Sequence, residues 1–162
     1  MINSRKNNSG ASRRSFIVFL DSSVILSALA SPSGGSRKIL QAVTKGKLQL
    51  FTTPFVIEEV AKHLHKLGVK PNELEILLKK KVIRVISDAP QHIIKKFHSV
   101  TVDPDDAPVL AGAVLSGSHV LVSLDKGHIL TDGVRKALKP LLVFSPKEFW
   151  GWLQEHRSTT IC

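Results

Sequence analysis

An unbroken run of five apolar residues, FIVFL at 16–20, ends directly at an acidic residue, Asp21. The run has no polar position, so a strand formed by it would be buried on both faces, which is typical of a parallel sheet covered by helices. A second run, HVLVSL at 119–124, is also mostly apolar and is followed directly by Asp125. The two segments therefore favour an α/β fold with carboxylates at one edge of its sheet.

Apolar strands alternate with helical patterns along the rest of the chain. Further strands are expected at 48–52, 82–86 and 141–144, and helices at 21–30, 36–46, 54–67, 71–80, from near Asp105 to 117, and 145–156, with 89–100 partly helical. This alternation predicts βαβ units with right-handed crossovers. The expected fold is a three-layer α/β/α sandwich around a central parallel sheet of about five strands.

The length of 162 residues is close to that of one domain. Residues 1–15 are polar and basic and are expected to form a flexible arm, followed by a folded domain at 16–156 and a tail at 157–162. No apolar run approaches the roughly 18 residues of a membrane span, and the first 15 residues lack a secretory signal pattern. The single cysteine, Cys162, excludes a disulfide scaffold or a cysteine zinc cluster. A cytoplasmic protein without membrane attachment is expected.

The chain is strongly basic, with 23 Lys and Arg against 13 Asp and Glu and a net charge of +10. An excess of this size is typical of proteins that bind nucleic acid or an anionic membrane. A surplus that only promotes solubility remains an alternative. Charge alone does not distinguish an enzyme from a binding protein.

Acidic side chains from four segments are expected at one edge of the sheet. Some directly follow strands, and the others lie near the starts of helices that begin at the same edge. The candidates are Asp21, Asp125, Asp105, Asp106, Glu58 and Glu59. Clustered carboxylates repel one another, so they stay ionised together only around a cation. Oxygen donors without cysteine favour Mg²⁺ or Mn²⁺.

Each acid also has a purely structural explanation. Asp21 is a good helix N-cap, Asp105 and Asp106 favour a helix dipole, and Asp125 suits a turn. Glu58 and Glu59 are placed to pair with a lysine on their own helix. Their convergence on one edge, and no single residue, is what favours a metal site.

With these positions identified, the sequence resembles the PIN-domain ribonucleases, a family that includes the VapC toxins of toxin–antitoxin pairs. The resemblance covers about residues 16–155 and rests on four motifs in order, with FSPKEFWGWL similar to the closing segment of a toxin subgroup. The motifs are FIVFLDSSVILSAL, TTPFVIEEVAKHL, VDPDDAPVLAGAVLSG and HVLVSLDKGHIL. The second motif places the family's glutamate at Glu59, and the third places its aspartate at Asp106. One departure is Ser23, where the family often has asparagine.

The resemblance implies a metal-dependent endoribonuclease that is the toxin of a toxin–antitoxin pair. It implies two-metal hydrolysis of RNA, a cognate antitoxin and frequent homodimers. The catalytic and metal-binding residues would be Asp21, Glu59, Asp106 and Asp125, around one or two Mg²⁺ or Mn²⁺ ions. Residues that orient ligands or touch substrate would be Ser22, Ser23, Asp103, Ser123 and His128.

Two other functions are weighed against this one. The first is a catalytically silent PIN-like module that binds RNA or a protein. The second is a receiver-like domain phosphorylated on aspartate, which ranks last because Asp21 has no acidic neighbour. His63 and His65 do not share a helix face and are not expected to bind zinc. Phe149 or Trp150 is expected in the core instead of on a base-stacking surface.

Overall fold

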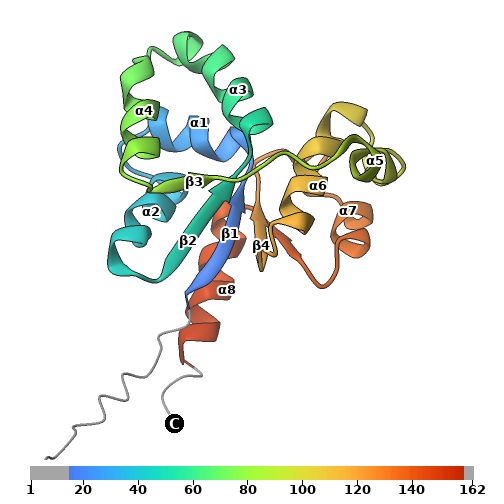
Figure 1. Ribbon diagram of the computed structural model, residues 1–162. Coiled ribbons are helices and arrows are strands. Elements are labelled where there is room, and N and C mark those ends of the chain that lie inside the picture. Colours follow the sequence, from blue (N-terminus) through green and yellow to red (C-terminus); the bar gives the residue numbers. More distant parts are fainter. Residues whose placement is uncertain (1–14, 159–162) are drawn as a thin grey trace, which may run out of the picture.

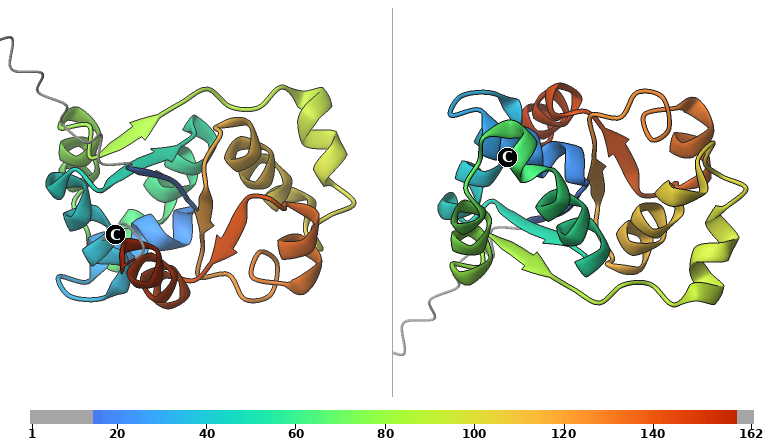
Figure 2. Two further views of the ribbon diagram at one scale, coloured as in Figure 1. Left: turned by 90° about the horizontal axis from the view of Figure 1, so that it is seen from below. Right: turned by 90° about the horizontal axis from the view of Figure 1, so that it is seen from above.

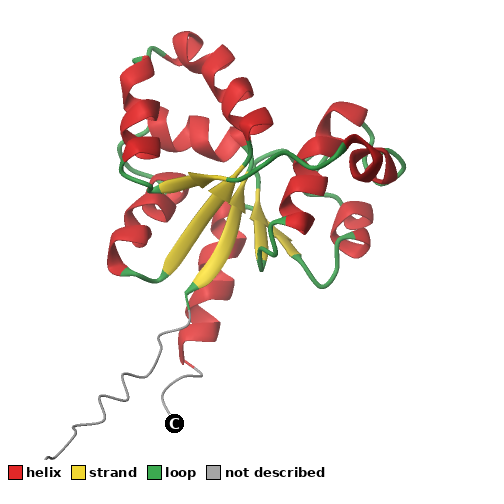
Figure 3. Ribbon diagram, viewed as in Figure 1, coloured by secondary structure: helices red, strands yellow, loops and turns green. Residues whose placement is uncertain are grey.

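The computed structural model describes residues 15–158 and contains a five-stranded, all-parallel sheet in the order β3-β2-β1-β4-β5 (Figures 1 and 3). The strands are β1 (Phe16–Leu20), β2 (Leu48–Thr52), β3 (Ile83–Val85), β4 (Val120–Val122) and β5 (Leu142–Phe144). This arrangement confirms the predicted α/β class and the parallel sheet of five strands. The expected N-terminal arm and C-terminal tail lie almost entirely outside the described residues.

Helices cover both faces of the sheet and form the outer layers of an α/β/α sandwich (Figure 2). One face is covered by α1 (Ser22–Ala30), α2 (Gly35–Ala42), α3 (Pro54–His63), α4 (Pro71–Lys79) and α8 (Pro146–Ser158). The other face is covered by α5 (Gln91–Ile94), α6 (Ala107–Leu115) and α7 (Asp132–Ala137). No helix in the described part of the chain is long and apolar enough to cross a membrane.

The core lies on both sides of β1, the middle strand. Val18, Phe19 and Leu20 are completely buried, as expected for a strand covered on both faces. At the edge of the sheet, Val85 of β3 is exposed. Among the closing-helix aromatics, Phe149 is fully buried and Trp150 is half-buried, so the core position belongs to Phe149.

Helix α6 packs unusually close to the sheet because its inner face is made of small residues. A Cβ on Gly112 would lie 3.0 Å from Thr53 Cγ2 and 3.2 Å from Phe19 Cζ, so only glycine fits without movement of its neighbours. Thr53 directly follows β2 and Phe19 lies near the end of β1, so α6 packs against the carboxyl ends of these strands. Asp106 immediately precedes this helix.

The structure differs from the predicted elements mainly at their ends. The helix expected at 54–67 changes to a 3₁₀ turn after His63, and the one expected from near Asp105 begins at Ala107 after a 3₁₀ turn. Helix α7 was not predicted from the sequence. It has six residues, fewer than two turns, which is too short to show a helical periodicity. Its N-cap is Thr131, whose hydroxyl accepts a hydrogen bond from Val134 N.

Candidate active site

The candidate site lies at the carboxyl ends of β1 and β4, where the order of the sheet reverses. From β1 the chain moves outward to β2, while β4 pairs on the opposite side of β1. Such a switch point is the usual ligand position in an open parallel sheet, because the connections there diverge to opposite faces. The register pairs Leu20 with Val122 and so places Asp21 beside Ser123.

Four carboxylates line a cavity of about 240 Å³ at this edge. They come from the end of β1, from α3, from the turn before α6 and from the loop after β4. The lining residues are Asp21, Glu59, Asp106 and Asp125, together with Ser22, Ser23, Leu26 and His63. The structure thus brings together all four acids that the family motifs single out.

The structure also shows which acid of each neighbouring pair faces the cavity, a question that the residues alone left open. Glu58 is 70 % exposed and pairs with Lys62 at 3.4 Å, whereas Glu59 faces the cavity. Asp105 is exposed, whereas Asp106 faces the cavity. Successive residues on a helical turn point about 100° apart, so only one of each pair faces inward.

Asp21 is the most buried of the four acids, with 5 % of its surface exposed. Its Oδ1 accepts a hydrogen bond from Ser22 N at 2.8 Å, so it caps α1 as well as lining the cavity. Its Oδ2 accepts from the hydroxyls of Ser23 at 2.9 Å and Ser123 at 2.7 Å. Burial raises the pKa of Asp21, the three hydrogen bonds oppose that rise, and the charge of Asp125 adds to it.

Ser23 and Ser123 connect Asp21 to the loop after β4. The Ser23 hydroxyl accepts from Leu124 N, and the Ser123 hydroxyl accepts from Asp125 N, both at 3.0 Å. Each hydroxyl therefore holds the Asp21 carboxylate and the neighbouring loop at once. The serine at position 23, where the family often has asparagine, still holds Asp21 in a fixed orientation.

Asp106 is held in a partly buried position with an unsatisfied oxygen. Burial raises the pKa of Asp106 to about 6, the charge of Asp125 adds to the rise, and His128 opposes it. His128 Nδ1 lies 3.3 Å from Asp106 Oδ2 and 3.5 Å from Asp125 Oδ2. Among the described residues, Asp106 Oδ2 is buried and accepts no hydrogen bond. Such an orphaned carboxylate oxygen is suited to a cation.

Glu59 completes the cavity from α3. Burial and then the charge of Asp21 raise the pKa of Glu59, while His63, the Ser22 hydroxyl and Lys62 lower it. His63 is held by a 2.8 Å contact between its Nδ1 and the Glu59 carbonyl oxygen. His63 lines the cavity but was not expected there from the sequence, although its spacing of four residues from Glu59 places both on one helix face.

Asp103 and His128 lie near Asp106 but are not among the residues that line the cavity. Asp103 Oδ1 accepts from Asp105 N at 3.0 Å and caps the turn before α6. One ligand atom from each of Asp103, Asp106 and His128 lies within 4.8 Å of the others. Asp125 Oδ1 accepts hydrogen bonds from Gly127 N and His128 N, so this acid also stabilises the turn after β4.

The donor set fits a hard divalent cation. Burial raises the pKa of three of the four carboxyls, and the nearby His63, Lys62 and His128 only partly oppose the rise. Asp106 Oδ2 accepts no hydrogen bond and lies 3.3 Å from His128 Nδ1, so it can still serve as a metal ligand. Carboxylate oxygens in this number favour Mg²⁺ or Mn²⁺ over softer metals.

Comparison with known proteins agrees with this geometry. The family profile described as the PIN domain matches residues 17–127. The fold is similar to a chain of VapBC2 from Rickettsia felis, solved bound to a DNA fragment from their promoter. That match has a TM-score of 0.59 and 14 % identity, over 80 % of this chain and 98 % of that chain.

A second similar structure is VapC20 from Mycobacterium tuberculosis, described as a sarcin–ricin loop cleaving toxin. It matches with a TM-score of 0.49 and 15 % identity, over 67 % of this chain and 89 % of that chain. No curated protein sequence matches the chain. On the strength of the profile match over most of the folded region, the chain belongs to the PIN-domain family.

Proposed function

We propose that this protein is a metal-dependent endoribonuclease that hydrolyses RNA phosphodiester bonds and is the toxin of a toxin–antitoxin pair. One observation carries the proposal: four carboxylates from four segments line a single cavity at the switch point of a PIN-domain sheet. The net charge of the whole chain, +10, suits a polyanionic substrate. The similarity of the fold to VapBC2 supports the toxin assignment.

Asp21, Glu59, Asp106 and Asp125 would hold one or two Mg²⁺ or Mn²⁺ ions. A cation bound there supplies Lewis-acid chemistry, which activates water for attack on the phosphorus and stabilises the leaving oxygen. The protein's own contribution is preorganisation, because ligands that are already oriented need no rearrangement when the substrate binds.

The serines and His128 have supporting roles in this proposal. Ser23 and Ser123 hold the Asp21 carboxylate in one orientation through the hydrogen bonds to its Oδ2. His128 lies beside Asp106 and Asp125 and is 41 % exposed, so its ring is accessible to a substrate phosphate. Asp103 holds the turn that carries Asp106.

A cognate antitoxin and a homodimer belong to the same proposal. Both follow from the resemblance to the VapC toxins, and the fold match to nearly the whole length of a VapBC2 chain supports the antitoxin. Light scattering of the purified protein, with and without the product of an adjacent gene, tests both. A monomer that binds no such product would contradict this part.

The nuclease activity is tested by incubating the purified protein with single-stranded RNA or DNA in Mn²⁺, Mg²⁺ or EDTA. We expect cleavage of RNA that requires the metal and leaves 5′-phosphate ends. Asp21→Asn and Asp106→Asn should abolish cleavage and leave the fold intact. An Asp106→Asn protein that cleaves at the wild-type rate would overturn the assignment.

Matched control variants are available one residue from two of the proposed ligands. Glu58→Gln and Asp105→Asn change exposed acids and should keep wild-type activity, whereas Glu59→Gln and Asp106→Asn should lose it. Metal binding without cleavage of any RNA would favour the silent PIN-like module instead.

A further inference from the structure

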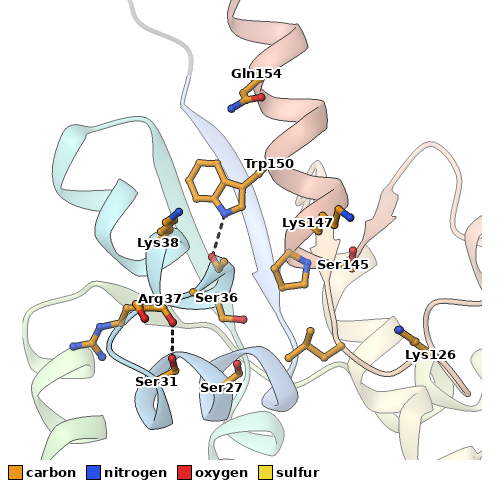
Figure 4. A pocket seen from close by; sticks show the side chains of 15 residues that line it. Ser27, Ser31, Ser36, Arg37, Lys38, Lys126, Ser145, Lys147, Trp150 and Gln154 are labelled. Carbon is orange, nitrogen blue, oxygen red and sulfur yellow. Dashed lines mark hydrogen bonds between the residues drawn. The ribbon is translucent and has the colours of Figure 1, made fainter.

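A second and larger cavity, of about 770 Å³, borders the carboxylate site and is lined by cations (Figure 4). Its walls come from α1, the loop to α2, the first turns of α2 and α8, and the loop after β4. Its charged residues are Arg37, Lys38, Lys126 and Lys147, and none of its lining residues is acidic. We propose that this basic groove binds the RNA strand next to the bond that is cleaved, an inference that rests on the proposed function.

The basic groove adjoins the carboxylate cavity, because residues that line the one are chain neighbours of residues that line the other. On α1, Ser23 lines the cavity and Ser27 lines the groove one turn later, about 6 Å along the helix axis. In the loop after β4, Asp125 lines the cavity, while Leu124 and Lys126 on either side of it line the groove. In this proposal, a strand with one phosphate at the carboxylates would extend past Ser27 and Lys126 into the groove.

The first turn of α2 adds anion-binding groups to the lysines and the arginine. Its N-cap, Gly34, has φ 146° and provides no side-chain cap, so the first N–H groups of the helix are left for a ligand. Ser36 lines the groove and is only 5 % exposed. A serine hydroxyl beside uncapped N–H groups is suited to a phosphate oxygen.

The groove also has an apolar side that suits nucleosides. It is formed by Leu124, which is exposed, and by Pro146 and the half-buried ring of Trp150. Trp150 Nε1 donates to the Gly35 carbonyl at 3.1 Å, which holds α8 against the first turn of α2 (Figure 4). Cations combined with an aromatic surface are typical of single-strand recognition, in which phosphates are neutralised and bases stack.

These features favour RNA over an acidic segment of a partner protein. An acidic peptide would use the cations but would have no reason to follow the groove into the carboxylate cavity. An RNA strand has phosphates for the cations, bases for Trp150 and a scissile phosphate for the cavity. The groove therefore fits the substrate class that the cavity is proposed to cleave.

The inference is tested by measuring binding of a fluorescent single-stranded RNA in EDTA, where no cleavage occurs, at several salt concentrations. The test variant is Lys38→Ala/Lys147→Ala, which removes two exposed groove lysines. The matched control is Lys95→Ala/Lys96→Ala, which removes two exposed lysines over the opposite face of the sheet. A melting curve for each variant confirms that the fold is kept.

We expect the slope of log K against log salt to be less steep by about 1.4 in the groove variant, because two phosphate contacts are lost. Its affinity for RNA should be about 25-fold weaker at ~0.1 M salt. The control variant should show the wild-type slope. An unchanged slope in the groove variant would overturn the inference, as would tighter binding of a poly-glutamate peptide than of RNA. RNA binding that depends on the groove in a protein that cleaves no RNA would support this inference and contradict the proposed nuclease. RNA cleavage by the wild type, together with a wild-type slope in the groove variant, would support the proposed nuclease and contradict this inference.

Discussion

The Ser123 hydroxyl at the end of β4 donates a 2.7 Å hydrogen bond to Asp21 Oδ2 at the end of β1, although 102 residues separate them. The bond is buried, and it joins the two strands at the point where the order of the sheet reverses. Together with Ser23, it determines the orientation of the most buried acid of the site.

Replacing Ser123 with alanine should therefore reduce both stability and activity. Loss of a buried hydrogen bond to a carboxylate costs about 1.5–3 kcal/mol in the free energy of unfolding. We expect Ser123→Ala to show this loss in urea unfolding, together with slower RNA cleavage. Ser87→Ala, which changes an exposed serine, is the control. Wild-type stability in Ser123→Ala would show that the bond has no energetic role.

The raised pKa of Asp106 predicts a dependence of stability on pH in metal-free protein. Burial raises this pKa from 3.8 to about 6. The contribution of Asp106 to the free energy of unfolding is therefore fully present below about pH 3.8 and is lost as the pH rises through about 6. We expect Asp106→Asn in EDTA to be more stable than the wild type at neutral pH. The difference should disappear near pH 4. Urea unfolding at both pH values measures it, and a difference independent of pH would contradict the prediction.

Divalent metal should stabilise the folded protein through the same acids. An ion that binds only the folded state adds about 2.7 kcal/mol to the free energy of unfolding at 100 times its Kd. We expect Mn²⁺ to raise the melting temperature of the wild type and of Asp105→Asn. The rise should be much smaller in Asp106→Asn, since Asp106 contributes the unsatisfied oxygen. Equal rises in all three proteins would place the ion elsewhere.

An ion pair between α7 and α8 should contribute a small, pH-dependent stabilisation. Arg135 Nη1 lies 2.7 Å and Nη2 3.1 Å from the two Glu148 carboxylate oxygens, and this pairing lowers the pKa of Glu148 to about 2. Both groups are partly exposed, so we expect Arg135→Ala to cost only about 0.5–1 kcal/mol at neutral pH. The cost should shrink as the pH falls from 4.5 towards 2, where Glu148 is protonated. Thermal melts over this range test it, and a constant cost would exclude an electrostatic origin.

The close approach of α6 to the sheet predicts opposite effects of alanine at two helical glycines. At Gly112, the new methyl group would lie 3.0 Å from Thr53 Cγ2, and overpacking of this kind costs about 1–3 kcal/mol. At Gly151 on α8, no atom lies within 4 Å of the new group, so alanine should stabilise the helix by about 0.5–1 kcal/mol. Denaturant unfolding of Gly112→Ala and Gly151→Ala compares them. A gain in stability in both would show that α6 adjusts freely.

The sequence was most informative where the signal is local. The run at 16–20 predicted β1 because it has no polar position, and the acid that follows it lies at the carboxyl edge as expected. The capping box at the start of α8 is equally local: Ser145 Oγ accepts from Glu148 N, and Glu148 Oε1 accepts from Ser145 N. Helix α7 escaped prediction because six residues show no periodicity.

Local signals in the residues did not show which of two neighbouring acids enters the cavity. Glu58 and Glu59 have the same chemistry and differ only in direction, so the way α3 packs decides which one enters the cavity. The same holds for Asp105 and Asp106, where the 3₁₀ turn before α6 leaves the first acid exposed and places the second in the cavity.

Sequence alone determined the order of strands and helices and the edge at which the acids gather, because hydrophobic periodicity and chain direction are local properties. The family motifs had named the four acids, but only the tertiary structure showed that they line one cavity, how Ser23 and Ser123 orient Asp21, and that a basic groove adjoins the cavity. Those features join segments distant along the chain, and their positions depend on how helices pack and strands register, which no local pattern specifies.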